Sequence, residues 1–400
     1  MNKDIKRILW VTGLYSFAGG LFYNFIELWL LGNGFNTSEV SFIYSIGALV
    51  TAIGIMVFSY VIKQKNIQNF ALGLLIIKAI IFYLMYQING MGFKSIISIL
   101  FIIDFVIDTE IYILLYPMIS SIKKDDKLYA TRGLTYEAFY YIAFFISGML
   151  IGKRLLTYNF TYNSYAIIGT FILFVSVVIL LDVDLDKYIK KSKKTINNST
   201  SSLIKALKDI KKDKVSILYL LFLFFTNISR FCILAFTMII FTKYLNFESG
   251  FASNLRLVFN IASVLLASIA LRKLTFKNNY INIFIKYGIR SILYLVALLY
   301  FNNTTLLIAI AYTLISISSY THTIDAPYIN RYEKDEQIAF LNVREVINYI
   351  SRAIGYLVCG LCIAVSLKMN LLVSLVFSLI SITIACTANY YINKNKVIKK

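Results

Sequence analysis

Acidic residues inside long apolar segments are the part of this sequence most able to do chemistry. Asp104 and Asp108 lie four residues apart in the apolar segment 95–119, so they share one face of a helix. Two carboxylates this close cannot both ionise cheaply, and one of them is expected to hold a proton. Such a carboxyl group can couple proton movement to another process. The alternative is a structural ion pair with Lys78.

The first apolar segment carries a polar face of its own. Gly13, Gly20, Asn24 and Glu27 follow one another at helical spacing, which puts them on one side of a helix. The two glycines would allow another helix to approach closely. Glu27 is then a second candidate for proton coupling, and Asn24 is a candidate for binding or gating. The alternative for Glu27 is a carboxylate that reaches the outer surface or caps a neighbouring loop.

Arginines dominate the charges buried in the second half of the sequence, whereas acids dominate in the first half. Arg230 and Arg352 each fall in the middle of an apolar segment. A guanidinium group does not release its charge, so each requires an anionic partner or water. That partner could be an acid of the first half, such as Asp108 for Arg230, or a carboxylate or phosphate of a substrate. Glu137 in the first half is a further candidate for substrate binding or gating. The alternative is pairing within the second half, for instance between Arg352 and Asp325.

His322, the only histidine, precedes Asp325 and Pro327 in the pattern His-x-x-Asp-x-Pro. The imidazole and the carboxylate lie one helical turn apart, so they form another candidate pair for proton coupling. A neutral histidine bonded to its own helix or to a tyrosine is the alternative. Nothing in the sequence resembles a phosphate-binding loop, a metal-ligand cluster or a nucleophile elbow. We therefore expect no enzyme, no cofactor and no metal.

The elements that position these residues are predicted to be membrane-spanning helices. Hydrophobic residues make up 59% of the 400 residues and charged residues only 15%, against about 25% charged in soluble domains. A span needs about 20 mostly apolar residues. Twelve segments qualify: 7–31, 38–62, 70–88, 95–119, 134–157, 165–183, 215–242, 248–271, 280–301, 305–329, 341–366 and 371–392.

The positive charge follows the predicted topology. Most of the 40 lysines and arginines fall in segments that would be cytoplasmic if both termini are cytoplasmic, and few fall in external ones. This is the asymmetry that the positive-inside rule describes. The net charge of +20 is therefore not interpreted as a signal for nucleic acid.

An internal repeat divides the chain into two halves. The only two prolines, Pro117 and Pro327, lie 210 residues apart, and at the same offset Lys124-Asp125-Asp126 matches Lys334-Asp335-Glu336. Two copies of a six-helix unit explain this register. The predicted parts are a helical bundle over 1–183, a basic cytoplasmic linker over 184–214 and a second bundle over 215–400.

Two six-helix halves, cytoplasmic termini and a basic central loop resemble the major facilitator superfamily. The loop after the second span, Ser59–Gln68, keeps only the basic character of the family's Gly-x-x-x-Asp-x-x-Gly-Arg-Lys motif. The position of Glu27 resembles the helix-one acid of the family's proton-coupled drug antiporters. The stretch from His322 to Pro327 is similar to the His-x-x-Glu-x-Pro stretch of its lactose/proton symporter.

The resemblance implies a secondary transporter that works by alternating access, with protons, a small-molecule substrate and the lipid bilayer as partners. We expect it to export a small organic or amphipathic compound, to function as a monomer and to lie in a bacterial cytoplasmic membrane as a multi-pass protein. Proton-coupled uptake of a sugar, a peptide or another zwitterionic solute is the main alternative. A non-transporting membrane sensor or assembly factor is a remote one.

Overall fold

The computed structural model describes residues 2–61, 66–88, 93–122, 126–152, 158–185, 210–211, 213–234, 237–273, 279–315 and 334–398. All regular secondary structure in these residues is helical. This is expected of apolar segments in lipid, because a helix satisfies its own backbone hydrogen bonds.

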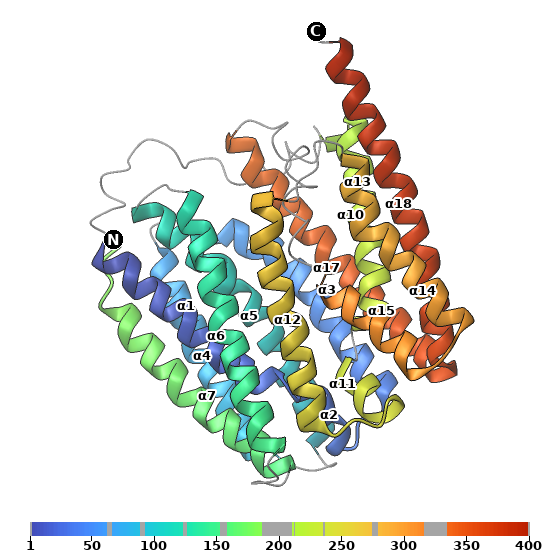
Figure 1. Ribbon diagram of the computed structural model, residues 1–400. Coiled ribbons are helices and arrows are strands. Elements are labelled where there is room, and N and C mark those ends of the chain that lie inside the picture. Colours follow the sequence, from blue (N-terminus) through green and yellow to red (C-terminus); the bar gives the residue numbers. More distant parts are fainter. Residues whose placement is uncertain are drawn as a thin grey trace. The chain divides into compact units, whose positions relative to one another are not determined.

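The helices of the first half follow the six spans predicted there. They are coloured from blue to green in Figure 1. Their bounds are α1 Lys3–Tyr23, α2 Ile26–Gly32, α3 Thr37–Val61, α4 Ile67–Gln87, α5 Lys94–Ile122, α6 Asp126–Gly152 and α7 Tyr158–Leu181.

The second half contains two π-helical segments as well as α-helices. Its elements are α10 Lys214–Leu234, α11 Thr237–Ile239, the π-helix η3 Ile240–Tyr244, α12 Ser249–Lys273, α13 Asn279–Ile283, the π-helix η4 Phe284–Gly288, α14 Ile289–Leu299, α15 Asn303–Ile315, α17 Lys334–Val365 and α18 Leu367–Ile398. The tenth predicted span is described only as far as Ile315, and most of the linker 184–214 lies outside the described residues.

The described helices have the length and composition of membrane spans. Eight of those in the described part of the chain are long and apolar enough to cross a membrane, and Ala138–Gly148 and Asn303–Leu314 are shorter apolar helices. The predicted all-helical polytopic fold, with about twelve helical segments, is therefore confirmed. The cytoplasmic position of the termini stays a prediction.

Two compact units divide the chain, and each contains a segment from the other half of the sequence. Unit 1 comprises Met1–Asn36, Gly54–Asn197 and Met238–Leu257. Unit 2 comprises Thr37–Ile53, Asn198–Thr237 and Val258–Lys400. The start of α12 therefore belongs with the first-half helices, and the start of α3 with the second-half helices.

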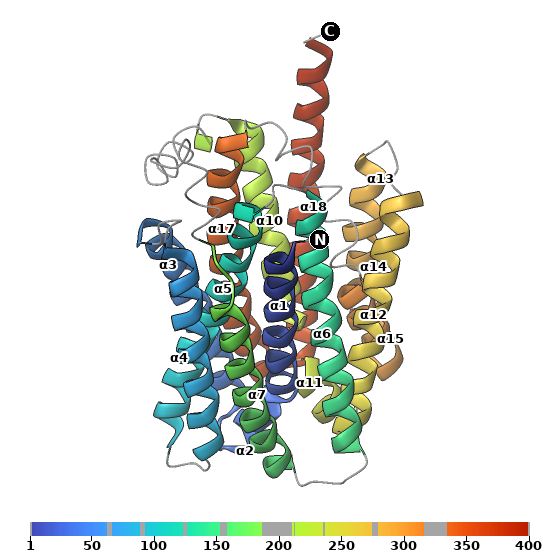
Figure 2. The same cartoon turned by 90° about the vertical axis from the view of Figure 1, so that its left-hand side faces the viewer.

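Unit 1 is organised around α1. This helix packs against α6 and α7, and α4 packs against α5 and α7, as the side-by-side ribbons of Figure 2 show. The predicted close approach at the glycine face is confirmed, because a Cβ on Gly20 would lie 2.7 Å from the backbone oxygen of Tyr140 on α6. Gly13 faces Phe139 on the same helix at 3.0 Å.

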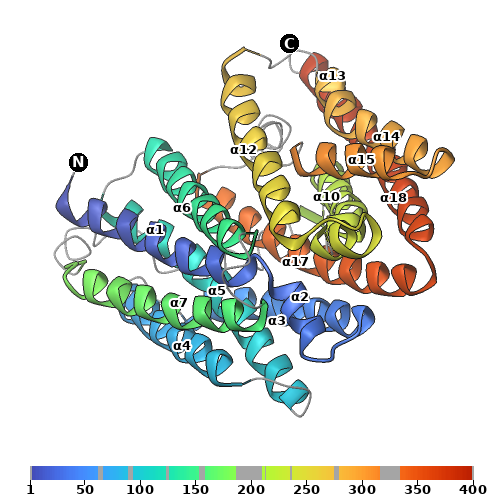
Figure 3. The same cartoon turned by 60° about the horizontal axis from the view of Figure 1, so that its bottom comes forward.

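Unit 2 is organised around α10. This helix packs against α17 and α18, and α14 packs against α15 and α18, which Figure 3 shows from a second direction. A buried cluster that includes Tyr219, Phe222, Tyr287 and Phe340 joins α10, η4 and α17.

The first helix of the chain is interrupted. Helix α1 ends at Tyr23, Asn24 and Phe25 are not helical, and helical structure resumes with α2 at Ile26.

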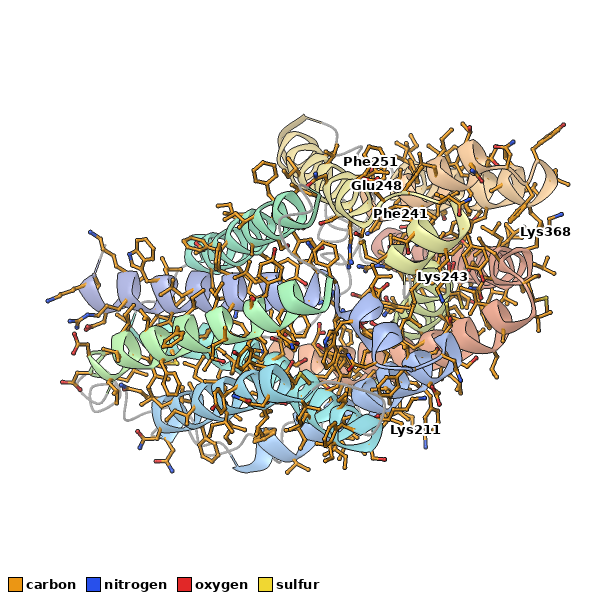
Figure 4. All side chains as sticks on the ribbon, turned by 90° about the horizontal axis from the view of Figure 1, so that it is seen from below. Lys211, Phe241, Lys243, Glu248, Phe251 and Lys368 are labelled. Carbon is orange, nitrogen blue, oxygen red and sulfur yellow. The ribbon has the colours of Figure 1, made fainter. Side chains whose placement is uncertain are left out.

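The turn after η3 brings the chain back into α12. Asn246 adopts a positive φ of 56°, and the backbone N–H of Phe247 donates to the oxygen of Phe241 at 2.9 Å. Figure 4 labels Phe241, Lys243, Glu248 and Phe251 on either side of this turn. The turn positions the first residues of α12, which contribute to the site described next.

Candidate functional site

A buried lysine lies between the two acids that the sequence singled out. Lys78 on α4 is fully buried, and its Nζ lies 3.1 Å from Oδ1 of Asp104 and 2.7 Å from Oδ1 of Asp108 on α5. The predicted alternative, an ion pair with Lys78, is therefore present. Because the carboxylates lie one helical turn apart, a single ammonium group reaches both.

Two tyrosines of α1 complete this cluster, which we call the Lys78 cluster: Lys78, Asp104, Asp108, Tyr15 and Tyr23. The hydroxyl of Tyr23 donates to Oδ2 of Asp104 and accepts from Nζ of Lys78 at 2.9 Å. The hydroxyl of Tyr15 donates to the backbone oxygen of Asp108. The ammonium group also lies over both rings, 5.5 Å from the centre of Tyr15 and 5.1 Å from that of Tyr23.

The Lys78 cluster contains one cation and two carboxylates. An uncompensated charge in an apolar interior is costly, so the cluster is electrically balanced only when one carboxyl group holds a proton. The Asp104 side chain is fully buried, whereas that of Asp108 is 24% exposed. Asp108 is therefore the more accessible of the two carboxylates.

A third acid on α5, Glu110, lies away from this cluster. Its side chain is buried, and its Oε1 has no hydrogen-bond partner in the part of the chain that the structure describes. It lies against α3, 3.6 Å from where a Cβ on Gly54 would be. Glu110 is therefore an independent buried carboxyl group and a useful comparison for Asp108.

Asn24, in the interruption between α1 and α2, joins three helices. Its Nδ2 lies 2.6 Å from Oγ of Ser147 on α6, 2.7 Å from Oγ of Ser253 on α12 and 3.2 Å from the oxygen of Phe144. An amide nitrogen has two hydrogens, so these acceptors share them. Gly148 makes the approach possible, because a Cβ there would lie 2.7 Å from Oγ of Ser253.

Glu27 lies one turn further along and also meets α12. Its Oε1 is 3.9 Å from Nη1 of Arg256, and its carboxylate accepts from the backbone N–H groups of Met238 and Ile239. Glu27 is buried, at 5% exposure. These contacts match the alternative in which Glu27 caps a neighbouring chain segment. Asn24 and Glu27 therefore both tie the interruption of the first helix to the segment that contains α11 and α12.

Arg230 and Arg352 lie within unit 2, on α10 and α17. Both guanidinium groups lie 5.1 Å from the ring centre of Phe231, and Arg352 also lies 4.8 Å from that of Tyr349. The Nε atoms of both arginines have no hydrogen-bond partner in the described part of the chain. Arg290, in the first turn of α14, acts electrostatically on Arg230 together with Arg352.

The side chains of three predicted site residues lie outside what the structure describes. His322 and Asp325 lie outside the described residues, and only the backbone of Glu137, in α6, is described. The described residues include no group of three His, Cys, Asp or Glu side chains able to hold a metal ion.

Comparison with known proteins rests on structure. No protein-family model matches the sequence, and no curated protein does. The nucleoside transporter NupG superposes with a TM-score of 0.73 at 13% identity, over 97% of this chain and 99% of that chain. A POT family transporter in complex with 5-aminolevulinic acid gives 0.68 at 13% identity, over 98% of this chain and 97% of that chain.

The xylose transporter XylE from E. coli, in a partially occluded inward-open conformation, gives a TM-score of 0.67 at 10% identity, over 96% of this chain and 97% of that chain. All three are described as transporters. At these identities the comparison establishes the architecture: the chain has the fold of major facilitator superfamily transporters.

Proposed function

We propose that this protein is a proton-coupled secondary transporter of a small polar organic solute, and that Asp108 carries the proton. The observation that supports this most directly is the ion pairing of fully buried Lys78 with both Asp104 and Asp108. A single carboxylate would suffice to neutralise the lysine. The second carboxylate can therefore bind a proton, because the ammonium group is still balanced by the first carboxylate.

Protonation of Asp108 would weaken its 2.7 Å contact with Lys78 and leave the ammonium group to Asp104 and Tyr23. Tyr23 is the last residue of α1, directly before the interruption at Asn24. A change at the Lys78 cluster would thereby reach the contacts of Asn24 and Glu27 with α12. Transporters of this kind alternate access by rearranging packed helices around discontinuous ones.

Glu27 is the residue on which the expectation of export rested. Its contacts with Arg256 and two backbone N–H groups support a role in holding helices together more than a role as a proton carrier in a cavity. Export of an amphipathic compound consequently loses its specific support, although it stays a candidate.

Uptake by proton symport is the candidate that the observations favour. The fold is shared with structures described as nucleoside, peptide and xylose transporters. The basic side chains of unit 2 also suit a polar or anionic solute better than a lipophilic cation, since like charges repel.

The experiment that tests the proposal is solute-driven proton movement in proteoliposomes with an internal pH indicator. A nucleoside, a dipeptide, xylose and succinate would be offered in turn, with a lipophilic cation as the probe for export. We expect one polar solute to acidify the lumen with the wild-type protein but not with Asp108→Asn. Asp182→Asn, at the exposed carboxylate that pairs with Arg7, is the matched control and should behave as the wild type.

Solute movement without proton movement would contradict proton coupling. Equal proton movement in Asp108→Asn would remove Asp108 from the mechanism. Gradient-driven accumulation of the lipophilic cation alone would overturn the polar-solute proposal in favour of export.

A further inference from the structure

Three arginines come together in unit 2 from three separate helices. Arg230 lies near the end of α10, Arg352 lies within α17, and Arg290 lies in the first turn of α14, directly after the π-helix η4. π-helical turns occur preferentially at functional sites, because they displace a side chain from its regular helical position. The positive charges of Arg290 and Arg352 both act on Arg230.

The described residues provide these arginines with no ion pair. No described carboxylate lies within 4.0 Å of Arg230, Arg290 or Arg352. Glu345 acts on Arg352 electrostatically, but it already pairs with Arg344 at 3.6 Å and accepts a hydrogen bond from Asn348 at 3.2 Å. Cations placed this close together need a compensating interaction, because their mutual repulsion is destabilising.

Each of the three guanidinium groups lies over an aromatic ring. Phe231 lies 5.1 Å from both Arg230 and Arg352, and Tyr287 lies 5.2 Å from Arg290. Stacking engages the flat face of a guanidinium and leaves its in-plane N–H groups for hydrogen bonds. The Nε atoms of all three arginines have no acceptor in the described part of the chain.

The three arginines differ in access. Arg290 is 2% exposed, and its one described hydrogen bond is a 3.4 Å contact to Oγ of Ser378. Arg230 and Arg352 are partly exposed. Arg230 and Arg352 are therefore accessible to a solute. Arg290 is buried, so it can act on a solute only through its positive charge.

Polar side chains next to Arg352 are already held in place. Asn227 on α10 donates to Oδ1 of Asn348 at 2.9 Å and to Oγ of Ser351 at 3.1 Å, both on α17. This network joins α10 to α17 within about one helical turn of each of the two accessible arginines. A site whose side chains are held by such bonds loses little entropy when it binds an anion.

We propose that Arg230 and Arg352, backed by Arg290, bind an oxyanion group of the transported solute, either a carboxylate or a phosphate. The inference rests on the proposed function, since it names the chemical class of that transporter's solute. Guanidinium groups match the paired oxygens of both anions with two parallel hydrogen bonds. Three cations also favour a doubly charged group over a singly charged one.

The competing explanation is that Asp325, outside the described residues, neutralises the arginines permanently. The two explanations predict opposite effects of removing one arginine. Loss of a cation from an unpaired cluster relieves repulsion, so Arg230→Gln should unfold at the same or a higher temperature than the wild type. Loss of a cation that pairs with a buried acid leaves that acid unpaired, and the unfolding temperature should fall.

The test is thermal unfolding of the purified full-length protein in lipid nanodiscs, titrated with inorganic phosphate and, separately, with succinate at constant ionic strength. We expect at least one of the two to raise the unfolding temperature saturably, and the more effective one distinguishes phosphate from carboxylate. The apparent dissociation constant should rise at least tenfold in Arg230→Gln and in Arg352→Gln. Arg352→Lys keeps the charge without the planar fork, so it should weaken binding less.

Two controls separate this inference from the proposed function. Arg132→Gln removes a buried arginine of unit 1 that donates to the oxygen of Tyr112 at 2.7 Å, and it should keep the anion response. Asp108→Asn should also keep the anion response, even though it loses proton coupling. If Asp108→Asn transports normally while the arginine variants lose anion binding, the proposed proton carrier is wrong and the oxyanion site stands.

The inference is overturned if neither anion stabilises the wild-type protein, or if the arginine variants respond as the wild type does. It is also overturned if Arg230→Gln lowers the unfolding temperature and anion binding appears only in Asp325→Asn, because Asp325 would then be the resident partner of the cluster.

Discussion

Nζ of Lys78 lies 2.7 Å from Oδ1 of Asp108 and 3.1 Å from Oδ1 of Asp104, so one buried cation is shared by two carboxylates on successive turns of α5. The tyrosines that surround the lysine come from α1. Three helices of unit 1 thus meet at one buried cation that contacts two carboxylates.

Replacement of Asp108 should separate proton coupling from folding. Asp108→Asn leaves the Lys78–Asp104 ion pair and the hydrogen bonds of Tyr23 in place, so the protein should stay folded. Gradient-driven transport should be lost, while exchange of solute across equal concentrations continues. Counterflow and gradient-driven flux in the same proteoliposomes measure the two activities. Loss of both in a folded protein would place Asp108 in solute binding instead.

Replacement of Lys78 should be severely destabilising. Lys78→Met leaves two buried carboxylates without a cation, and breaking a buried ion pair by removing one partner costs about 3–5 kcal/mol. We expect the loss to appear as a lower unfolding temperature. Lys78→Met combined with Asp104→Leu should recover much of it, because the buried carboxylate that lost its partner is gone. An unchanged unfolding temperature in Lys78→Met would contradict the ion pairs described here.

The close packing of α1 on α6 gives a test that involves no charge. In Gly20→Val the new side chain would meet the backbone oxygen of Tyr140, which cannot move aside freely, and overpacking typically costs about 1–3 kcal/mol. Gly73→Ala on α4 is the matched control, because nothing lies within 4 Å of its Cβ position. That variant should be stabilised by up to about 1 kcal/mol through helix propensity. Equal stability of the two variants would contradict the predicted effect of packing.

We expect the contact between α6 and α12 to open during transport. Cβ of Ser253 lies 3.1 Å from where a Cβ on Gly148 would be, so the pair Gly148→Cys and Ser253→Cys needs only a small shift to form a disulfide. Oxidation should arrest transport, and a reductant should restore it. The single variants Gly148→Cys and Ser253→Cys should be insensitive to oxidant. Full activity of the cross-linked protein would show that this contact stays closed throughout the cycle.

Much of the fold could be predicted from the sequence, because long apolar segments in a membrane have little choice but to be helical. In the residues that the structure describes, each predicted span is occupied by helix, although the first is interrupted at Asn24 and Phe25 and the tenth is described only as far as Ile315. The residues around Asn24 do not predict that interruption. The polar contacts of Asn24 with Ser147 and Ser253 hold it in place, and these residues lie far apart in the sequence.

The candidate site was predicted only in part, because its contacts join residues that lie far apart in the sequence. Helical spacing brought Asp104 and Asp108 together, and Lys78 was identified as their alternative partner. Tyr15 and Tyr23 were not identified as site residues, because their roles depend on which helix faces which. One tyrosine out of 30 gives no signal until the packing of α1 is known.

The most direct test of the central claim is infrared difference spectroscopy of the purified protein during acidification, which detects the C=O stretch of each carboxyl group as it takes up a proton. We predict a band that appears in the wild-type protein, is absent from Asp108→Asn, and is retained in Glu110→Gln and Asp182→Asn. A band that persists in Asp108→Asn and disappears in Glu110→Gln would place the proton on Glu110 and contradict the account.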